Sequence, residues 1–172
     1  MLDRLHRAVK AFLAELGRQP LEEVQLQRLA HILAAALNLE HAGDILDKGL
    51  LSLLAKRMKR RLRFSPAELA EIDGMHEHLL SQLRLAAAVL MGEDLEAARR
   101  LVEEKERFRE LGRAVTEAQI ERLTAGDQPG ETETLELDLV RDLKRVEAHL
   151  AAIAHPLLER SNLLHRSRLV RL

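Results

Sequence analysis

Acidic side chains interrupt a leucine stripe in the segment between residues 26 and 54. Alternating steps of three and four residues trace one helical face here. Its three central positions are Glu40, Asp44 and Asp47, and leucine occupies all the remaining ones. Because an unpartnered carboxylate is costly to bury, a helix packed on this face would require a compensating charge. Two hypotheses follow. The carboxylates belong to a cation site or polar network, or the stripe is partly exposed and Asp44 pairs with Lys48.

A second acidic stripe lies near the end of the chain, next to a stripe of aliphatic residues. Asp138 and Asp142 are one helical turn apart there, and Arg145 and His149 continue the same stripe. Two carboxylates at this spacing could share a hard divalent cation such as Mg²⁺ or Ca²⁺, or iron. A local ion pair between Asp142 and Arg145 is equally open. The predicted metal ligands across both stripes are Glu40, Asp44, Asp47, Asp138 and Asp142.

A basic cluster follows the first stripe, and it consists of Lys56, Arg57, Lys59, Arg60, Arg61 and Arg63. Cations at this position complement the negative C-terminal end of a helix dipole. The alternative is a contact with a partner or with anionic lipid, worth about 1 kcal/mol per basic residue near the surface. Binding to nucleic acid is not expected, because no aromatic residues for base stacking are interleaved with the basic ones.

Catalytic residues are not predicted. The chain has no cysteine, no glycine-rich phosphate loop and no His-Glu-x-x-His zinc motif. His41 lies beside Glu40 and could be a metal ligand, but a histidine in this setting is more often a helix-surface residue. We therefore expect a protein that is not an enzyme.

Composition predicts an all-α fold. Hydrophobic residues make up 47% of the chain, which excludes a disordered polar chain. Leucine and alanine dominate and are strong helix formers, whereas aromatic residues, which help to fill β-sheet faces, are limited to three phenylalanines. The net charge of −1 gives no global attraction for nucleic acid. No apolar run approaches the length needed to span a bilayer, so we expect the chain to be soluble.

Glycine and proline mark the ends of five long helices. Ser65 and Pro66 form an N-terminal cap and first turn, Gly92 ends a helix, and Gly126 to Gly130 form a turn. The predicted helices form an antiparallel bundle and span residues 2–16, 20–63, 66–91, 93–125 and 132–160. The last helix is expected to bend at Pro156, and a tail over 161–172 follows it.

Several segments together resemble one family. Residues 36–50 resemble the PhoU signature, with Glu40 and Asp44 on its Glu and Asp positions and with His41 and Ala42 in place of its Arg and Ile. The longer pattern is similar to the C-terminal PhoU-like domain of bacterial sodium–phosphate cotransporters of the Na/Pi type II kind. The resemblance extends over about residues 1–160. It is carried by NLEHAGDILDKGL, AKRMKRRLRFSP, EDLEAARRLVEEKERFREL and LDLVRDLKRVEAHLAAIAHPLLE.

The resemblance implies two three-helix bundles, with metal clusters on E/D-x-x-x-D motifs. Residues 1–64 would be a partial first bundle whose first helix lies upstream, and residues 65–160 would be the second bundle. The second motif departs from the family, because Lys144 and Ala148 stand at its Glu and Asp positions.

The function implied by the resemblance is that of a non-catalytic regulatory domain of a sodium-dependent phosphate transporter. It would lie on the cytoplasmic side of the inner membrane, attached to the transporter's membrane domain. A stand-alone PhoU-type regulator of phosphate uptake or a metal-binding helical bundle is the alternative. We also expect a homodimer, because the first helix carries an apolar stripe without an evident partner, formed by Leu5, Val9, Phe12, Leu13 and Leu16.

Overall fold

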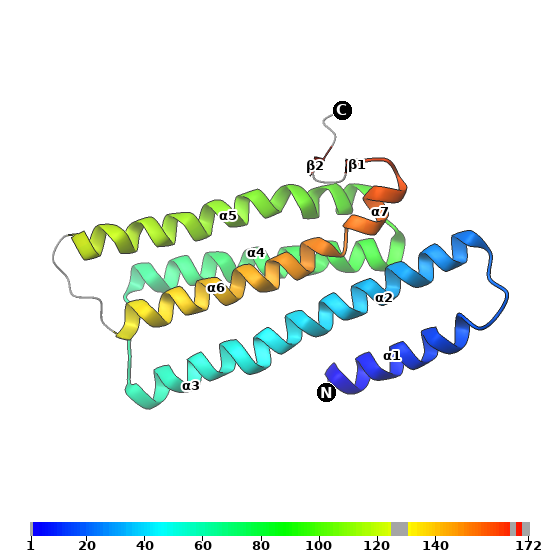
Figure 1. Cartoon of the computed structure of the whole chain (residues 1–172). Coiled ribbons are helices and arrows are strands. Elements are labelled where there is room, and N and C mark those ends of the chain that lie inside the picture. Colours follow the sequence, from blue (N-terminus) through cyan, green and yellow to red (C-terminus); the bar gives the residue numbers. More distant parts are fainter. Residues whose placement is uncertain (1, 125–130, 166–167, 170–172) are drawn as a thin grey trace.

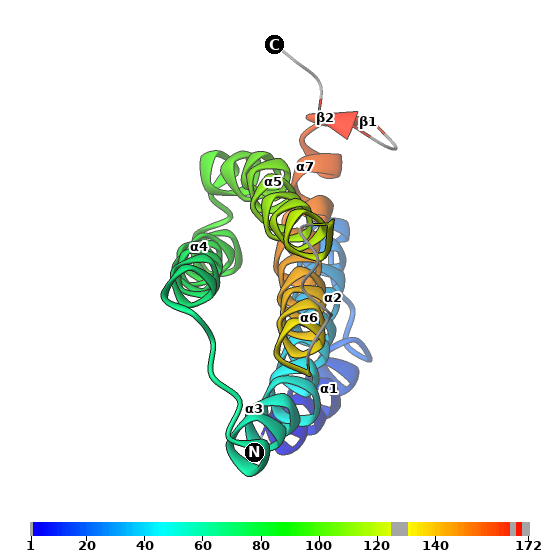
Figure 2. The ribbon, with the colours of Figure 1, turned by 90° about the vertical axis from the view of Figure 1, so that its left-hand side faces the viewer.

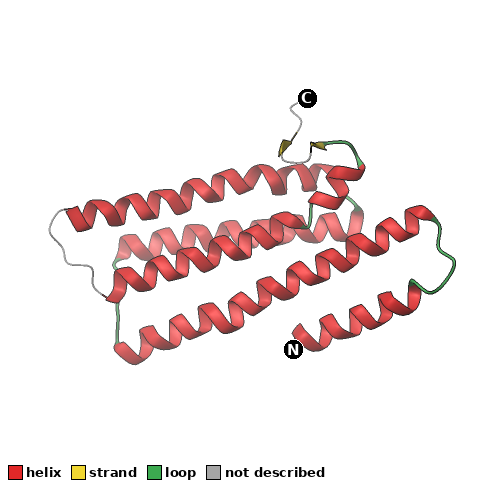
Figure 3. Ribbon diagram, in the orientation of Figure 1, coloured by secondary structure: helices red, strands yellow, loops and turns green. Residues whose placement is uncertain are grey.

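The chain folds into long helices that run side by side (Figure 1). A computed structural model describes residues 2–124, 131–165 and 168–169. The helices are α1 (Leu2–Leu16), α2 (Glu23–Asp44), the π-helix η1 (Ile45–Leu50), α3 (Leu51–Arg60), α4 (Pro66–Gly92), α5 (Leu95–Thr124), α6 (Glu131–Ala152) and α7 (His155–Arg160). Two short antiparallel strands follow, β1 (Leu164–His165) and β2 (Arg168–Leu169). Helices dominate the described residues (Figure 3), which confirms the predicted all-α class.

The predicted helix over 20–63 is continuous but begins later and ends earlier. It runs through α2, η1 and α3, from Glu23 to Arg60. Pro20 therefore lies in the preceding loop and not in the first turn, because Glu22 is the N-cap and its backbone N–H donates to the Gln25 side chain at 3.0 Å. The cap predicted at Ser65 is confirmed, since its hydroxyl accepts from the Glu68 N–H at 3.2 Å and the Glu68 carboxylate accepts from the Ser65 N–H at 2.6 Å.

The predicted bend near Pro156 is a break between two helices. α6 ends at Ala152, and Pro156 lies in the first turn of α7, where its missing N–H is not needed. The break leaves the Ile153 carbonyl for another partner, and the buried His31 ring on α2 donates to it at 2.9 Å. The predicted turn at residues 126–130 lies outside the described residues.

The core lies mainly between α4, α5 and α6, each of which packs against the other two. Its largest fully buried side chains include Phe108, Met75, Leu101 and Val89. α2 packs along the outer side of α6, and α1 packs on α2 (Figures 1 and 2). α6 is therefore the element shared by the core and the outer helices. The proposed division into bundles at residue 64 falls in the α3–α4 connection and stays a prediction.

The leucine stripe of α2 and α3 does not face the core, which agrees with the hypothesis of a partly exposed stripe. Its members Leu26, Leu33, Leu37, Leu51 and Leu54 are 38–56% exposed. Small residues form the buried face of α2 instead, among them Ala35, Ala42 and Gly43. Small side chains let two helix backbones approach closely, which explains why this face and not the leucine face packs on α6.

The apolar stripe of α1 is divided in the same way. Leu5 and Phe12 are exposed, whereas Leu13 is buried and is therefore unavailable for the predicted dimer contact. Within residues 2–124, 131–165 and 168–169, no helix is both long and apolar enough to cross a membrane.

Candidate functional site

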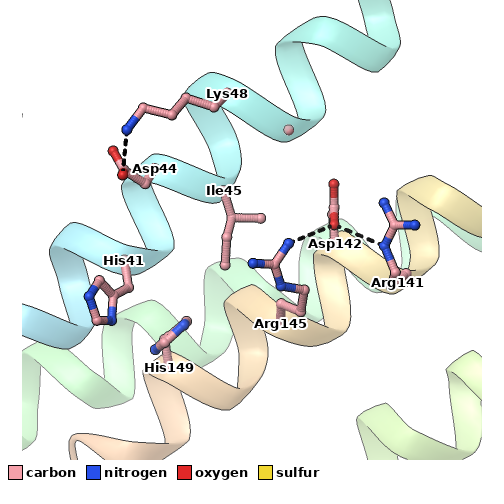
Figure 4. A pocket seen from close by; sticks show the side chains of 9 residues that line it. His41, Asp44, Ile45, Lys48, Arg141, Asp142, Arg145 and His149 are labelled. Atoms are coloured by element: carbon pink, nitrogen blue, oxygen red, sulfur yellow. Dashed lines mark hydrogen bonds and ion pairs between the residues drawn. The ribbon is translucent and has the colours of Figure 1, made fainter.

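A polar pocket lies where α2 and η1 meet α6, and its cavity volume is about 620 Å³ (Figure 4). It brings together residues from both predicted acidic stripes, Asp44 from the first and Asp142 from the second. The lining residues share a polar or small character except for one isoleucine, and they are His41, Asp44, Ile45, Lys48, Gly49, Arg141, Asp142, Arg145 and His149.

Asp142 is the anchor of the α6 wall. Its side chain is only 4% exposed, and its Oδ1 accepts from Arg141 Nε at 3.3 Å and from Arg145 Nη1 at 3.2 Å. The hydrogen bond to Asp142 raises the pKa of the Arg141 guanidinium, and the charges of Asp142 and Asp138 act in the same direction. Both arginine side chains remain 60% exposed. A buried carboxylate thus holds two accessible guanidinium groups at the pocket (Figure 4).

Gly49 makes room for this carboxylate. A Cβ atom at position 49 would lie 2.7 Å from Asp142 Oδ2, closer than a real side chain tolerates. Gly49 belongs to the π-helix η1, and π-turns inside α-helices are frequent at functional sites. Sequence reasoning treated this segment as regular helix and missed both features. The signal that could have revealed them is a glycine inside an otherwise strong helical pattern.

The opposite wall carries the ion pair between Asp44 and Lys48. Lys48 Nζ lies 2.6 Å from Asp44 Oδ2, one helical turn away. This is the local pairing weighed as one of two hypotheses from the sequence, and the structure confirms it. Both side chains are accessible, so the pair forms part of the pocket surface.

Two histidines of the pocket lining, His41 and His149, lie edge to face with their ring centroids 5.1 Å apart. His149 Nδ1 lies 3.0 Å from the Asn38 side-chain oxygen, whose own amide nitrogen donates to the Ala34 carbonyl at 2.9 Å. This arrangement makes Nδ1 the protonated nitrogen of His149 and leaves Nε2 as an acceptor. Burial lowers the pKa of His149, and the charges of His41 and Arg145 lower it further, so the ring is neutral at pH 7.

The other predicted metal ligands lie apart from this pair of aspartates. Glu40 points toward α1, where its carboxylate is 3.8 Å from His6, and it also lies 3.6 Å from His41. Asp47 is exposed, and Asp138 accepts from Arg141 at 2.7 Å. Among the residues that the structure describes, no three His, Asp or Glu side chains are placed to hold a metal ion. The five ligands therefore do not form a single cluster, and a bound cation stays a prediction.

The basic cluster at the end of α3 is divided between local contacts and exposed charge. Arg57 lies over the Phe64 ring at 4.9 Å, and Arg60 pairs with Glu131 of α6. Lys59, Arg61 and Arg63 are exposed, and so is the neighbouring Met58. The role predicted for Lys56 and the rest of this cluster at a membrane or partner surface stays a prediction.

Comparison with known proteins gives a family and a set of relatives. Residues 72–156, from within α4 to the start of α7, match the PhoU domain. The chain is 36% identical over 156 residues to proteins named "Putative inorganic phosphate export protein YjbB" from Escherichia coli K12, Shigella flexneri and Salmonella typhimurium LT2. The aligned region is 90% of this chain but only 29% of each relative. No solved structure matches the chain.

The matched region supplies the α6 wall of the pocket, and α2 with η1 supplies the other wall. The all-α structure is consistent with the helical bundle of the matched PhoU family. Over 156 residues the chain is similar to these relatives, and its residues 72–156 are similar to the PhoU domain.

Proposed function

We propose that the chain is a non-catalytic regulatory domain of an inorganic phosphate transport system. The observation that carries the proposal is the 36% identity over 156 residues to proteins named for phosphate export. The PhoU domain over residues 72–156 supports it. The pocket between α2, η1 and α6 adds a site at which such a domain could respond to a ligand.

The fuller form of the proposal attaches the domain to a sodium-dependent phosphate transporter, on the cytoplasmic side of the membrane. The chain spans about 29% of the length of the curated relatives, which leaves room in those proteins for a further domain. The exposed leucines of α2 and α3 offer an apolar face that such a domain could cover. A stand-alone regulator of phosphate uptake is the alternative form.

The test is a phosphate flux measurement in cells that lack the coding sequence for this chain. We expect the rate of radiolabelled phosphate movement to change and to return to normal when the sequence is restored, with sulfate flux as the control. Replacing external sodium by choline tests the sodium coupling. Unchanged phosphate flux in the deleted cells would overturn the proposal. A change in flux that does not depend on sodium would support a role in phosphate transport but not the coupling to sodium.

We also propose a homodimer, supported by the exposed side chains of Leu5 and Phe12 on α1 beside the leucine stripe of α2. Light scattering should give twice the chain mass at tens of micromolar. A monomer at that concentration would contradict the proposal.

A divalent or iron cation at Glu40 and Asp44 is the remaining element of the proposal. At Asp44 it would have to displace Lys48. A cation that binds only the folded chain raises the melting temperature, and Asp44→Asn should remove that rise. Unchanged melting of the original chain with calcium, manganese or iron would contradict it.

A further inference from the structure

On the α6 wall of the pocket the guanidinium groups are exposed to solvent, whereas the Asp142 carboxylate is buried. The pocket lining includes three cationic side chains, Lys48, Arg141 and Arg145, and two carboxylates. Asp142 lies behind the arginines, almost fully buried, whereas both guanidinium groups are largely exposed. A ligand that enters from solvent therefore meets N–H groups before it meets the Asp142 carboxylate.

Both guanidinium groups have donors to spare. The bonds to Asp138 and Asp142 use Nε and Nη1 of Arg141 and only Nη1 of Arg145. A guanidinium carries five N–H donors in a planar fork, a geometry that suits the oxygens of a phosphate or carboxylate. Since Asp142 fixes both groups from one oxygen, they are oriented before any ligand binds.

The same pocket also contains hydrogen-bond acceptors, which a fully deprotonated anion would not favour. Asp44 is accessible on the α2 wall, and the tautomer set by Asn38 leaves His149 Nε2 with a lone pair. An oxyanion that retains a hydroxyl group can satisfy these acceptors, because its O–H donates to them. At neutral pH orthophosphate and phosphate monoesters differ in this respect from sulfate. Orthophosphate always keeps at least one proton, a monoester keeps one in part, and sulfate has none.

We propose that this pocket binds a protonated tetrahedral oxyanion, with Arg141 and Arg145 donating to its oxygens and Asp44 or His149 Nε2 accepting from its hydroxyl. Lys48 contributes a third positive charge beside the ligand. The choice of orthophosphate as the physiological member of this class rests on the proposed function, whereas the binding chemistry rests on the pocket alone. The cavity, at about 620 Å³, has room for the anion and several water molecules.

The experiment is isothermal titration calorimetry of the purified chain in a buffer free of phosphate, at pH 7. The titrants are sodium phosphate, glycerol 3-phosphate and sodium sulfate at equal ionic strength. We expect phosphate to bind at least tenfold more tightly than sulfate. The glycerol 3-phosphate arm distinguishes free phosphate from a phosphate ester as the preferred source of the group.

Two variants locate the site. Arg145→Gln removes one fork and should weaken phosphate binding at least tenfold, because a hydrogen bond to a charged group is lost. Lys48→Gln should weaken it by a smaller factor without disturbing the buried Asp142. Arg84→Gln, at an exposed arginine of α4 remote from the pocket lining, is the matched control and should bind as the original chain does.

Three results would overturn the proposal: no phosphate binding at millimolar concentration, equal binding of sulfate, or unchanged binding in both pocket variants. Circular dichroism of each variant verifies that it is folded. If Arg145→Gln is unfolded, Lys48→Gln alone decides the location of the site. A change in phosphate flux on deletion without phosphate binding would leave the regulatory role standing and remove only this inference. Phosphate binding without a flux change would support this inference and overturn the proposed regulatory role.

Discussion

The three helices α4, α5 and α6 bury their large apolar side chains among themselves, whereas α1, α2 and α3 leave many of theirs exposed. Phe108 of α5 is 1% exposed, but Phe12 of α1 is 64% exposed. Both regions consist of amphipathic helices of similar composition, so sequence pattern alone does not separate them. The difference lies in the number of neighbours that each helix has. α6 has helices on both sides, and α1 contacts α2 on one side.

Buried polar pairs are a second difference between the two regions. Gln82 of α4 donates to the Glu147 carboxylate of α6 at 3.4 Å, and Gln119 of α5 donates to Glu136 of α6 at 2.5 Å. All four side chains are buried. In the outer region the acidic side chains are instead paired at the surface, as in Asp44 with Lys48. The stability of the inner region, α4 to α6, should therefore depend on its buried side chains and on protonation of its carboxylates. The stability of the outer region, α1 to α3, should depend more on surface charge.

The sharpest test of the comparison is a pair of phenylalanine truncations. Phe108→Ala removes a fully buried ring and should lower the free energy of unfolding by about 3–5 kcal/mol. Phe12→Ala should change it by about 0.5 kcal/mol or less, because the ring is already largely in water. Urea denaturation followed by circular dichroism measures both values. If Phe12→Ala strongly lowers the free energy of unfolding at high protein concentration but not at low concentration, a second copy of the chain buries α1. The difference between the two regions would then apply to the monomer only.

A pair of glycine substitutions tests the contact between the two regions. Gly49→Ala places a methyl group 2.7 Å from Asp142 Oδ2 and should cost about 1–3 kcal/mol, the usual range for overpacking. Gly74→Ala in α4 is the matched control, since nothing lies within 4 Å of the new methyl group. It should stabilise the chain by about 0.5–1 kcal/mol through helix propensity. Equal effects of the two substitutions would mean that Asp142 does not lie against η1.

The sequence predicted the helices well but not the faces on which they pack. Ser65, Pro66 and Gly92 define helix ends through local chemistry, and the structure confirms them. The buried face of α2 was missed because hydrophobic periodicity favours leucine, whereas close contact with α6 selects Ala35 and Ala42. Such a choice depends on the neighbouring helix and not on α2 alone.

The candidate site was predicted in part, for a similar reason. Asp44 and Asp142 were identified separately, each on its own helix. That they line one pocket depends on the register of α2 against α6, for which no local pattern exists. Arg141 was overlooked because only a cation or Arg145 was considered as the partner of Asp142, although one buried oxygen accepts from both arginines. Gly49 and Asn38 act through contacts with α6 that are equally non-local.

The buried carboxylate of Glu147 should make the inner region respond to pH. Burial raises the pKa of Glu147, despite the opposing effects of Lys105 and the Gln82 hydrogen bond. An acid whose pKa is higher in the folded state than in the unfolded state favours folding when it is protonated. Its contribution is therefore full below the ordinary glutamate pKa and is lost as the pH rises through the raised value.

Glu147→Gln should accordingly stabilise the chain at pH 7, and the gain should shrink as the pH falls toward the ordinary glutamate pKa of 4.5. The measurement is the difference in unfolding free energy between variant and original chain at several pH values. Glu117→Gln is a matched control at an exposed position of α5. A gain that is independent of pH would mean that Glu147 is not buried as a carboxylate.

The basic end of α3 gives a further test, because Lys59, Arg61 and Arg63 are exposed there. Arg57 and Arg60 have local contacts with Phe64 and Glu131, so the test uses the exposed side chains of Lys59, Arg61 and Arg63. We expect weak binding to vesicles that contain anionic lipid and none to neutral vesicles, with about 1 kcal/mol from each basic residue. Binding should weaken as salt rises from 0.1 M to 1 M, because the Debye length falls from about 10 Å to about 3 Å.

Replacing those three residues by glutamate should abolish vesicle binding and leave the helix content unchanged, since only Lys59 lies within α3 and glutamate is also a good helix former. The matched control replaces three exposed arginines of α4 and α5, Arg84, Arg100 and Arg113, by glutamate, which changes the net charge by the same amount. If both triple variants lose binding equally, overall charge and not the end of α3 is responsible. Vesicle binding would then no longer distinguish the outer region from the inner one, whereas a loss confined to the α3 variant would place the electrostatic contact at the end of α3.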